Sequence, residues 1–294
     1  MLELFKHLSL RLGMTAMLSP ILAFVGGSGE AMAVPLSEIR DRGYITVAVK
    51  ENRAPLSFVN DGGDYEGYEI EIARRLAEEL LGDESAVRFV PVRNAERLNV
   101  AIAEEVDVTI AAVTLTEARR RLVDFSYPYY LDGAALIARS PNVAALEDLR
   151  FGRIAVLDRS STVAHVRYIL PGAKLEGVRS YAEGLALLES GEVDAFAGDA
   201  SVLTGWLRAM TEGYRLLPNL LSADPLAVVI PKGDRHDELR EEINAALRRW
   251  YREGWLQSRA AYWGLPAGAG QFVDLSPAVE GSVIEGERLA EPEG

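Results

Sequence analysis

From residue 44 onward, the apolar positions follow two alternating patterns. Short apolar runs, typical of buried strands, alternate with longer segments in which apolar residues return every three or four positions, typical of amphipathic helices. Strands are expected at 44–49, 87–92 and 107–112, and helices at 68–81 and 95–105. This order predicts a β-α-β-α-β unit with a mostly parallel sheet.

The same alternation begins again after the turn at Pro141. Strands are expected at 153–157, 174–178 and 193–197, and helices at 162–169, 181–190 and 201–210. Each unit contains the sequence E-x-V-D or G-E-V-D between a helix and its following strand, at 104–107 and 191–194. Two similar units predict two lobes with a cleft between them, and ligands of such sheets bind at the carboxyl ends of the strands.

The last part of the chain adds a strand at 226–232 and a long amphipathic helix at 237–262. Trp250 and Tyr251 lie at helical spacing in this helix, which favours a role in core packing over ligand binding. Beyond Gly264 the sequence becomes rich in Pro, Gly, Ala and Glu. Residues 266–294 are therefore expected to form a mostly disordered acidic tail.

Composition narrows the classes of function. The 294 residues carry a formal net charge of -13, which argues against binding to nucleic acid or to anionic membranes but not against a small anionic ligand in a locally basic cleft. The chain has no cysteine, which excludes disulfides, thiolate catalysis, Cys-ligated metals and lipoprotein acylation. Its three histidines are far apart in sequence. Neither a metal site nor a cofactor is expected.

The N-terminus has the pattern of an export signal. Lys6 and Arg11 precede an apolar stretch at 12–25, and a small-x-small sequence follows at 31–33. The apolar stretch contains Pro20 and is short for a spanning helix. We expect 1–33 to be a signal peptide cleaved after Ala33, so that the mature protein is periplasmic; the alternative is an uncleaved membrane anchor.

Residues 112–130 contain a candidate receptor for a carboxylate. An apolar strand run ends here, and Thr114 and Thr116 stand five and three residues before Arg119. An arginine offers a rigid two-pronged donor, and the first turn of a helix offers unpaired N–H groups. The alternative is an ordinary strand–turn–helix with solvated arginines.

Several sequence motifs occur together in a characteristic order. They are I-T-V-A-V, A-P-L-S-F, G-Y-E-I-E-I-A, V-D-V-T-I-A-A-V-T-L-T-E-A-R, V-D-F-S-Y-P-Y-Y, D-L-R-F-G-R-I-A-V-L and G-E-V-D-A-F-A-G-D. Over 36–265 the chain resembles the family 3 extracellular solute-binding proteins of polar amino-acid ABC transporters. The resemblance implies a two-lobed α/β fold of the type II periplasmic-binding-protein kind, in which each lobe is a mostly parallel sheet flanked by helices. Lobe 1 would comprise 34–132 and 223–265, lobe 2 would comprise 133–222, and a two-strand hinge would join them near 130–134 and 221–226.

The resemblance also implies roles for individual residues. Arg119 would clamp the ligand α-carboxylate, helped by Thr114 and by the backbone of Ala112. Asp199 would bind the α-ammonium group, although a helix N-cap before 201–210 is the alternative for this side chain. A loop of hydroxyl residues in lobe 2 would cap the carboxylate: Ser160, Ser161 and Thr162.

Two departures from the family pattern affect the carboxylate end of the site. Ala118 stands where the family usually has Glu beside the arginine, so a contact that supports Arg119 is missing. Arg159 stands where the lobe 2 loop usually has glycine, so the geometry of that loop is expected to differ from that of the family.

Three further departures and one match bear on specificity. Arg53 and Asn94 occupy positions that are aromatic in many members, and Lys50 occupies a position that is Asp in members that bind basic or amide side chains. Arg97 matches an arginine of acidic-amino-acid binders. A pocket end lined by these cations favours a second carboxylate and repels basic ligands, so the expected ligand is glutamate or aspartate. The alternative is that these side chains point to solvent on the rim of the cleft.

The resemblance implies a monomeric binding protein without catalytic activity, which delivers its ligand to an ABC transporter permease when the lobes close. The same fold also occurs in exported enzymes such as cyclohexadienyl or arogenate dehydratase and in ligand-sensing domains. An enzyme would require a general acid in the cleft, for which Asp158 and His165 are the candidates in lobe 2.

Overall fold

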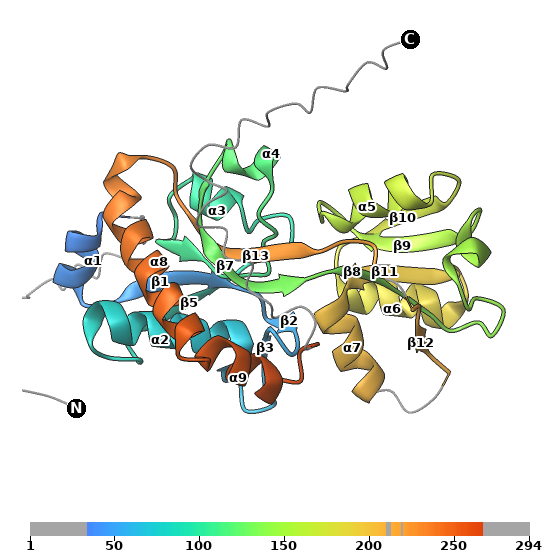
Figure 1. The fold of residues 1–294 in the computed structure, drawn as a ribbon, viewed down its shortest axis with the longest axis horizontal. Coiled ribbons are helices and arrows are strands. Elements are labelled where there is room, and N and C mark those ends of the chain that lie inside the picture. Colours follow the sequence, from blue (N-terminus) through green and yellow to red (C-terminus); the bar gives the residue numbers. More distant parts are fainter. Residues whose placement is uncertain (1–33, 210–212, 219, 267–294) are drawn as a thin grey trace, which may run out of the picture. The chain divides into compact units, whose positions relative to one another are not determined.

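The computed structural model describes residues 34–209, 213–218 and 220–266 (Figure 1). The expected signal peptide lies outside the described residues, as does the expected acidic tail from residue 267 onward. The α-helices and 3-10 helices are α1 (Leu36–Arg42), α2 (Tyr68–Leu81), α3 (Asn99–Ile102), α4 (Glu117–Arg120), η1 (Leu146–Leu149), α5 (Thr162–Ile169), α6 (Tyr181–Ser190), α7 (Ala200–Ala209), η2 (Asp234–His236), α8 (Asp237–Arg252) and α9 (Trp255–Tyr262). The strands are β1 (Ile45–Val49), β2 (Asn52–Arg53), β3 (Ser57–Val59), β4 (Tyr65–Glu66), β5 (Val87–Pro91), β6 (Val108–Thr109), β7 (Asp124–Asp132), β8 (Ala134–Ala138), β9 (Arg153–Leu157), β10 (Lys174–Val178), β11 (Ala195–Asp199), β12 (Arg215–Leu216) and β13 (Asp224–Ile230).

The strands form two five-stranded sheets and one small sheet. The first sheet has the order β5-β1-β6-β13-β7, and the second has the order β10-β9-β11-β8-β12. Strands β2, β3 and β4 form the small sheet. In each five-stranded sheet the strands of one β-α-β-α-β unit are parallel, while the other two strands pair antiparallel to their neighbours. Both sheets are therefore mixed. The antiparallel strands are those by which the chain leaves or enters each sheet, β7 and β13 in the first sheet and β8 and β12 in the second.

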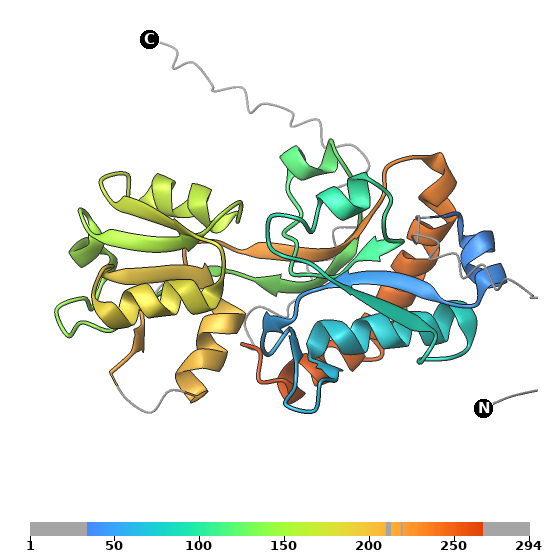
Figure 2. The ribbon, with the colours of Figure 1, turned by 180° about the vertical axis from the view of Figure 1, so that it is seen from behind.

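The chain passes between the two sheets twice. Strand β7 continues into β8 with only Gly133 between them, and the segment after β12 leads into β13. Strands β7 and β13 pair antiparallel over most of their length and lie side by side (Figures 1 and 2). Asp132 pairs with Asp224 in this ladder, so the ends of both connecting strands are bonded to each other.

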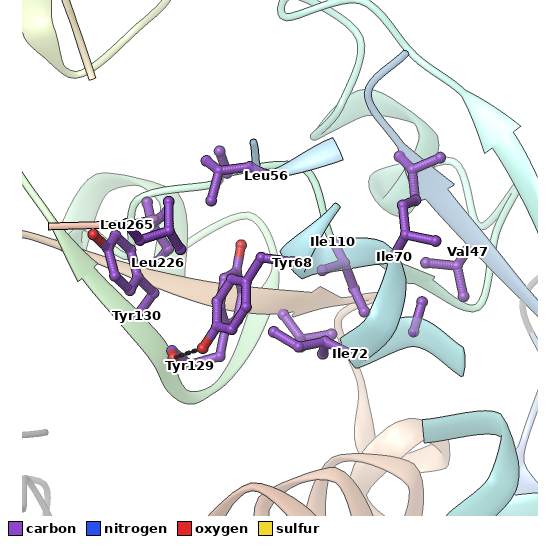
Figure 3. Packing of buried hydrophobic residues seen from close by; sticks show 14 of the residues in the cluster. Val47, Leu56, Tyr68, Ile70, Ile72, Ile110, Tyr129, Tyr130, Leu226 and Leu265 are labelled. Atoms are coloured by element: carbon purple, nitrogen blue, oxygen red, sulfur yellow. Dashed lines mark hydrogen bonds between the residues drawn. The ribbon is translucent and has the colours of Figure 1, made fainter. Parts of the chain in front are cut away.

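The first sheet buries both of its faces. Val47 and Val49 of β1 belong to the large hydrophobic cluster, which also contains the apolar face of α2, whereas Ala48 belongs to a small cluster on the other side. This is the alternation expected along a strand that is covered on both faces. Figure 3 shows the large cluster at close range, with the Tyr68 hydroxyl donating to the Tyr129 carbonyl oxygen at 3.0 Å.

The second sheet is also covered on both faces. Helix α5 lies on one face, and α6 and α7 lie on the other (Figures 1 and 2). Val166 of α5 packs with Ile154 and Val156 of β9, while Phe196 of β11 packs edge-on against Tyr181 of α6. The carboxyl end of β9 is followed by a short loop that leads into α5, whereas β11 leads directly into α7.

Three elements differ from the sequence-based predictions. The helix expected at 95–105 is reduced to α3, because residues 94–98 form turns that place Arg97 on the carbonyl groups of Ala111 and Ala112. The strand expected at 107–112 pairs only at β6, and Ala112 adopts a left-handed φ of 49°. The helix expected at 237–262 is divided into α8 and α9 by Gly254, whose φ of 73° no right-handed helix accommodates.

Candidate functional site

The end of β6 is fixed by two buried side chains. The Ala112 N–H donates to Glu69 Oε1 at 2.6 Å, and Arg97 Nη1 donates to the carbonyl oxygens of Ala112 at 2.5 Å and Ala111 at 3.0 Å. A left-handed conformation is costly for a residue with a Cβ, and these bonds hold Ala112 in it. Both backbone polar groups of Ala112 therefore have internal partners, and its contact with a ligand stays a prediction.

Glu69 is a site residue that the sequence-based predictions missed. Its side chain is fully buried, and Oε1 also accepts a 2.5 Å hydrogen bond from the Tyr129 hydroxyl. Burial raises the pKa of Glu69, while the hydrogen bond from Tyr129 and the charge of Arg53 act in the opposite direction. The sequence does contain a signal, because Glu69 falls on the same helix face as the apolar Ile72, Ala73 and Leu76, where an unpaired carboxylate is not expected.

Arg119 is positioned as a donor at the start of the short helix α4. The Thr116 hydroxyl caps this helix by accepting from the Arg119 N–H at 3.3 Å. The half-buried guanidinium donates from Nη1 to the Thr114 carbonyl oxygen at 2.8 Å and from Nη2 to the Arg159 carbonyl oxygen at 3.4 Å. In the part of the chain that the structure describes, it pairs with no carboxylate, and burial lowers its pKa. A ligand carboxylate would provide this guanidinium with an anionic partner.

The loop at 158–162 brings the hydroxyl residues of lobe 2 close to Thr114 and Arg119. Arg159 has a φ of 57°, so this arginine adopts the left-handed conformation that glycine adopts most readily. Ser161 Oγ lies 3.0 Å from Thr114 Oγ1, while the Ser160 hydroxyl donates to the Leu157 carbonyl oxygen at 2.8 Å. Thr162 is buried and begins α5. The structure therefore brings Ser161 and Thr114 together directly, with Ser160 and Thr162 beside them in sequence.

Asp199, at the end of β11, already has a cationic partner. Its Oδ2 forms an ion pair with Arg53 Nη2 and accepts a 2.6 Å hydrogen bond from the Tyr181 hydroxyl. The Arg53 guanidinium is 2% exposed and lies over the Tyr181 ring, 5.2 Å from its centroid. The Ser201 N–H at the start of α7 donates to Asp132, at 3.1 Å, rather than to Asp199. The carboxylate of Asp199 is therefore engaged by arginine and tyrosine, not by the helix that follows it.

The other residues expected at the side-chain end of the pocket are buried rather than solvent-exposed. Lys50 is 8% exposed, Arg97 is 3% exposed and Asn94 is 6% exposed. Burial, followed by the charges of Arg53 and Arg97, lowers the pKa of Lys50 to about 7. Burial, followed by the charges of Arg53 and Arg119, lowers the pKa of Arg97. The four cations are therefore electrostatic neighbours of one another.

A cleft of about 1440 Å³ opens above part of this cluster. Its lining includes Lys50, Arg53 and Asn94 from the first unit, and Asp158, Arg159 and Tyr181 from the second. Asn94 Nδ2 bridges the two units by donating to the Asp158 carbonyl oxygen at 2.6 Å. Arg119, Thr114 and Asp199 do not line this cleft. The predicted residues thus include one group that lines the cleft, Lys50, Arg53 and Asn94, and a second group around Arg119 that would receive a carboxylate. The charge of buried Arg97 interacts with Arg53 of the first group and with Arg119 of the second.

The described residues contain no helix that is long and apolar enough to cross a membrane. The two residues considered as general acids lie in different places. His165 Nε2 is 3.1 Å from Asp224 Oδ1, near the β7–β13 ladder, and Asp158 is exposed at the cleft.

Comparisons with known proteins agree with this architecture. The model of the bacterial extracellular solute-binding proteins, family 3, matches residues 45–266. A glutamine-binding protein of a Bacillus subtilis ABC transporter is 29% identical over 78% of this chain and 85% of its own length. A glutamate-binding protein of Corynebacterium efficiens is 28% identical over 79% of this chain and 80% of its own.

A solved structure supports the fold assignment. The crystal structure of an ancestral amino acid-binding protein, a precursor of cyclohexadienyl dehydratase, superposes with a TM-score of 0.71 at 27% identity, covering 78% of this chain and 98% of that protein. The two-lobed α/β fold predicted from the sequence is confirmed, with mixed sheets. The chain belongs to the family 3 bacterial extracellular solute-binding proteins.

Proposed function

We propose that this protein binds an acidic L-amino acid, glutamate or aspartate, in the periplasm and delivers it to an ABC transporter permease when its two lobes close. The observation that carries this proposal is the set of buried cations, Lys50, Arg53 and Arg97, with Arg119 beside them. It acts as a monomer, and residues 1–33 direct its export and are then removed.

The buried charges favour an anionic ligand. Lys50, Arg53, Arg97 and Arg119 are accompanied by the buried carboxylates of Glu69, Asp132, Asp199 and Asp224. Among these four cations only Arg53 forms an ion pair within the described residues, with Asp199, so the other three have no carboxylate in direct contact. Uncompensated buried charge is unfavourable, and a ligand that brings two carboxylates compensates it. Lysine, arginine and histidine would add a further cation and are disfavoured.

The relatives support an amino-acid ligand without fixing which one. Those described above are named for binding glutamine and glutamate. Glutamine matches glutamate in shape but lacks the second negative charge. The buried cations favour glutamate over glutamine because a neutral amide gives Lys50 and Arg97 no anionic partner.

We propose a transport function rather than catalysis. The His165 ring faces Asp224 near the β7–β13 ladder, and Asp158 is exposed, so neither is presented as a buried general acid to the predicted ligand site. The superposed ancestral protein, described as a precursor of a dehydratase, makes the enzyme alternative worth testing. Turnover of prephenate or arogenate by the purified protein would contradict a transport-only function.

Calorimetric titration of the protein without residues 1–33 tests the proposed ligand class. Glutamate, aspartate, glutamine, arginine and leucine form the panel. We expect binding of glutamate or aspartate and none of arginine or leucine. Tight binding of arginine or leucine without binding of an acidic ligand would refute the proposal.

A further inference from the structure

In an amino-acid-binding site of this kind, the ligand ammonium group needs a free carboxylate. Asp199 is the residue expected to provide it, yet its Oδ2 is already bonded to the Arg53 guanidinium and to the Tyr181 hydroxyl. The same tyrosine hydroxyl also accepts the Asp199 N–H at 3.0 Å. Asp199 is thus held from two sides by groups of the protein itself.

Displacing Arg53 to admit an ammonium group would be unfavourable. The arginine is 2% exposed, and its Nη2 also donates to the Tyr181 hydroxyl at 3.3 Å. A displaced Arg53 would lose the only ion pair that it forms in the described residues while remaining close to Lys50 and Arg97, whose pKa values it already lowers. Breaking a buried ion pair by removing one partner leaves the other charge uncompensated, which is strongly destabilising.

The surroundings of the pair offer little to a second cation. Two fully buried carboxylates interact electrostatically with Arg53, and both have hydrogen-bond partners. Glu69 Oε1 accepts from the Ala112 N–H and the Tyr129 hydroxyl, and Asp132 accepts from the N–H and the hydroxyl of Ser201. The Glu96 and Glu183 side chains line the cleft but are 48% and 39% exposed, so solvent screens them. The interior is therefore arranged to receive negative charge rather than an ammonium group.

We infer that the site recognises its ligand through two carboxylates and does not require the α-ammonium group, so that its ligand class is the short dicarboxylates, amino-substituted or not. The inference rests on the proposed acidic-ligand function. In this arrangement one ligand carboxylate binds Arg119 and the hydroxyls of Thr114 and Ser161. The other carboxylate is neutralised by Lys50 and Arg97, while Arg53 remains paired with Asp199.

Paired ligands test this with the wild-type protein. Glutamate is compared with glutarate, and aspartate with succinate, by calorimetry at one pH and ionic strength. We expect each desamino ligand to bind within about threefold of its amino acid, or more tightly. If the ammonium group is required, its charge-assisted hydrogen bonds are lost and the desamino ligand binds at least about a hundredfold more weakly, which would overturn the inference.

Two variants test whether the Arg53–Asp199 pair is what makes the ligand ammonium group unnecessary. Arg53→Met frees Asp199, and we expect the preference for glutamate over glutarate to increase at least about tenfold. Asp199→Asn keeps the size of the side chain and a partner for Tyr181, and we expect it to retain glutamate binding. An unchanged preference in the first variant, or selective loss of glutamate binding in the second, would contradict the inference.

The outcomes separate the inference from the proposed function. Binding of glutamate without glutarate refutes only the inference, because the acidic-ligand class survives. Binding of glutamine, arginine or leucine without any dicarboxylate refutes the proposed function as well. Thermal unfolding of each variant, compared with the wild type, shows whether a loss of binding reflects loss of the fold.

Discussion

At the scale of single residues, this protein is distinguished by the cations that are buried in its interior. Lys50 is the clearest case. Its pKa falls from its usual 10.5 to about 7 because burial penalises the ammonium form and Arg53 and Arg97 repel it. Between about pH 7 and 10.5 the unfolded chain holds a proton at Lys50 that the native protein lacks. The contribution of Lys50 to the free energy of unfolding therefore rises with pH in that range. Below about pH 7 the buried lysine is charged in the native protein, and it destabilises the fold by its full amount.

The same shift predicts how binding depends on pH. A bound carboxylate raises the pKa of Lys50, so ligand binding above about pH 7 takes up a proton. We expect the affinity for glutamate to decrease between about pH 7 and 8.5, by at most about tenfold per pH unit. Calorimetry in buffers of different ionisation enthalpy measures the proton uptake directly. Lys50→Met should bind glutamate more weakly, and its affinity should not depend on pH between about pH 7 and 8.5. A wild-type affinity that is constant over this pH range would contradict the role of Lys50.

Arg119 should dominate the affinity for the first carboxylate. Arg119→Ala removes its bidentate donor and should weaken glutamate binding at least about a hundredfold while the protein stays folded. Arg120→Ala is the matched control, because that neighbouring arginine lies on the same short helix and pairs with Glu117. Equal losses in the two variants, or retained affinity in Arg119→Ala, would refute the role assigned to Arg119.

The sequence is informative about which residues are unusual but not about how they pair. Lys50 and Arg53 depart from the residues that the family resemblance implies, whereas Arg97 matches an arginine of acidic-amino-acid binders. The structure places all three in the interior. The pairing of Arg53 with Asp199 could not be predicted, because it depends on the positions of β2 and β11 in separate sheets. Glu69 was missed because its partners, Ala112 and Tyr129, are also distant in sequence.

At the scale of elements, apolar periodicity predicted most boundaries closely where a clear stop signal exists. Helix α2 has the expected bounds because Gly82 ends it in a left-handed conformation, with φ of 77°. The predictions were wrong where a local conformation interrupts a continuous apolar pattern. Gly254 divides α8 from α9 although the pattern continues across it, and Arg97 draws residues 94–98 into turns.

The loop before α5 allows a test at this scale. Arg159 adopts φ of 57°, which costs a residue with a Cβ about 1 kcal/mol or more relative to glycine. We expect Arg159→Gly to raise the free energy of unfolding by up to about 1 kcal/mol in urea denaturation. Arg179→Gly, at a highly exposed arginine outside the left-handed region, should lower it instead through the greater freedom of the unfolded chain. Equal destabilisation by both changes would show that the left-handed conformation is not strained.

At the scale of the molecule, the residues that bridge the two units are also candidate ligand contacts. Thr114 meets Ser161, Asn94 meets the Asp158 carbonyl group, and Arg53 meets Asp199. A ligand that inserts between Thr114 and Ser161 replaces a direct contact between the units with contacts through itself, while Arg53 stays paired with Asp199. Binding and lobe closure are therefore coupled through the same side chains.

The central claim is that buried positive charge selects the ligand, and glutamate and glutamine test it most directly because they differ by one charge and almost nothing in shape. Calorimetric titration of the protein lacking residues 1–33 with each ligand, near pH 7, gives the comparison. We predict that glutamate binds at least about a hundredfold more tightly than glutamine. Equal affinities, or tighter binding of glutamine, would contradict the claim.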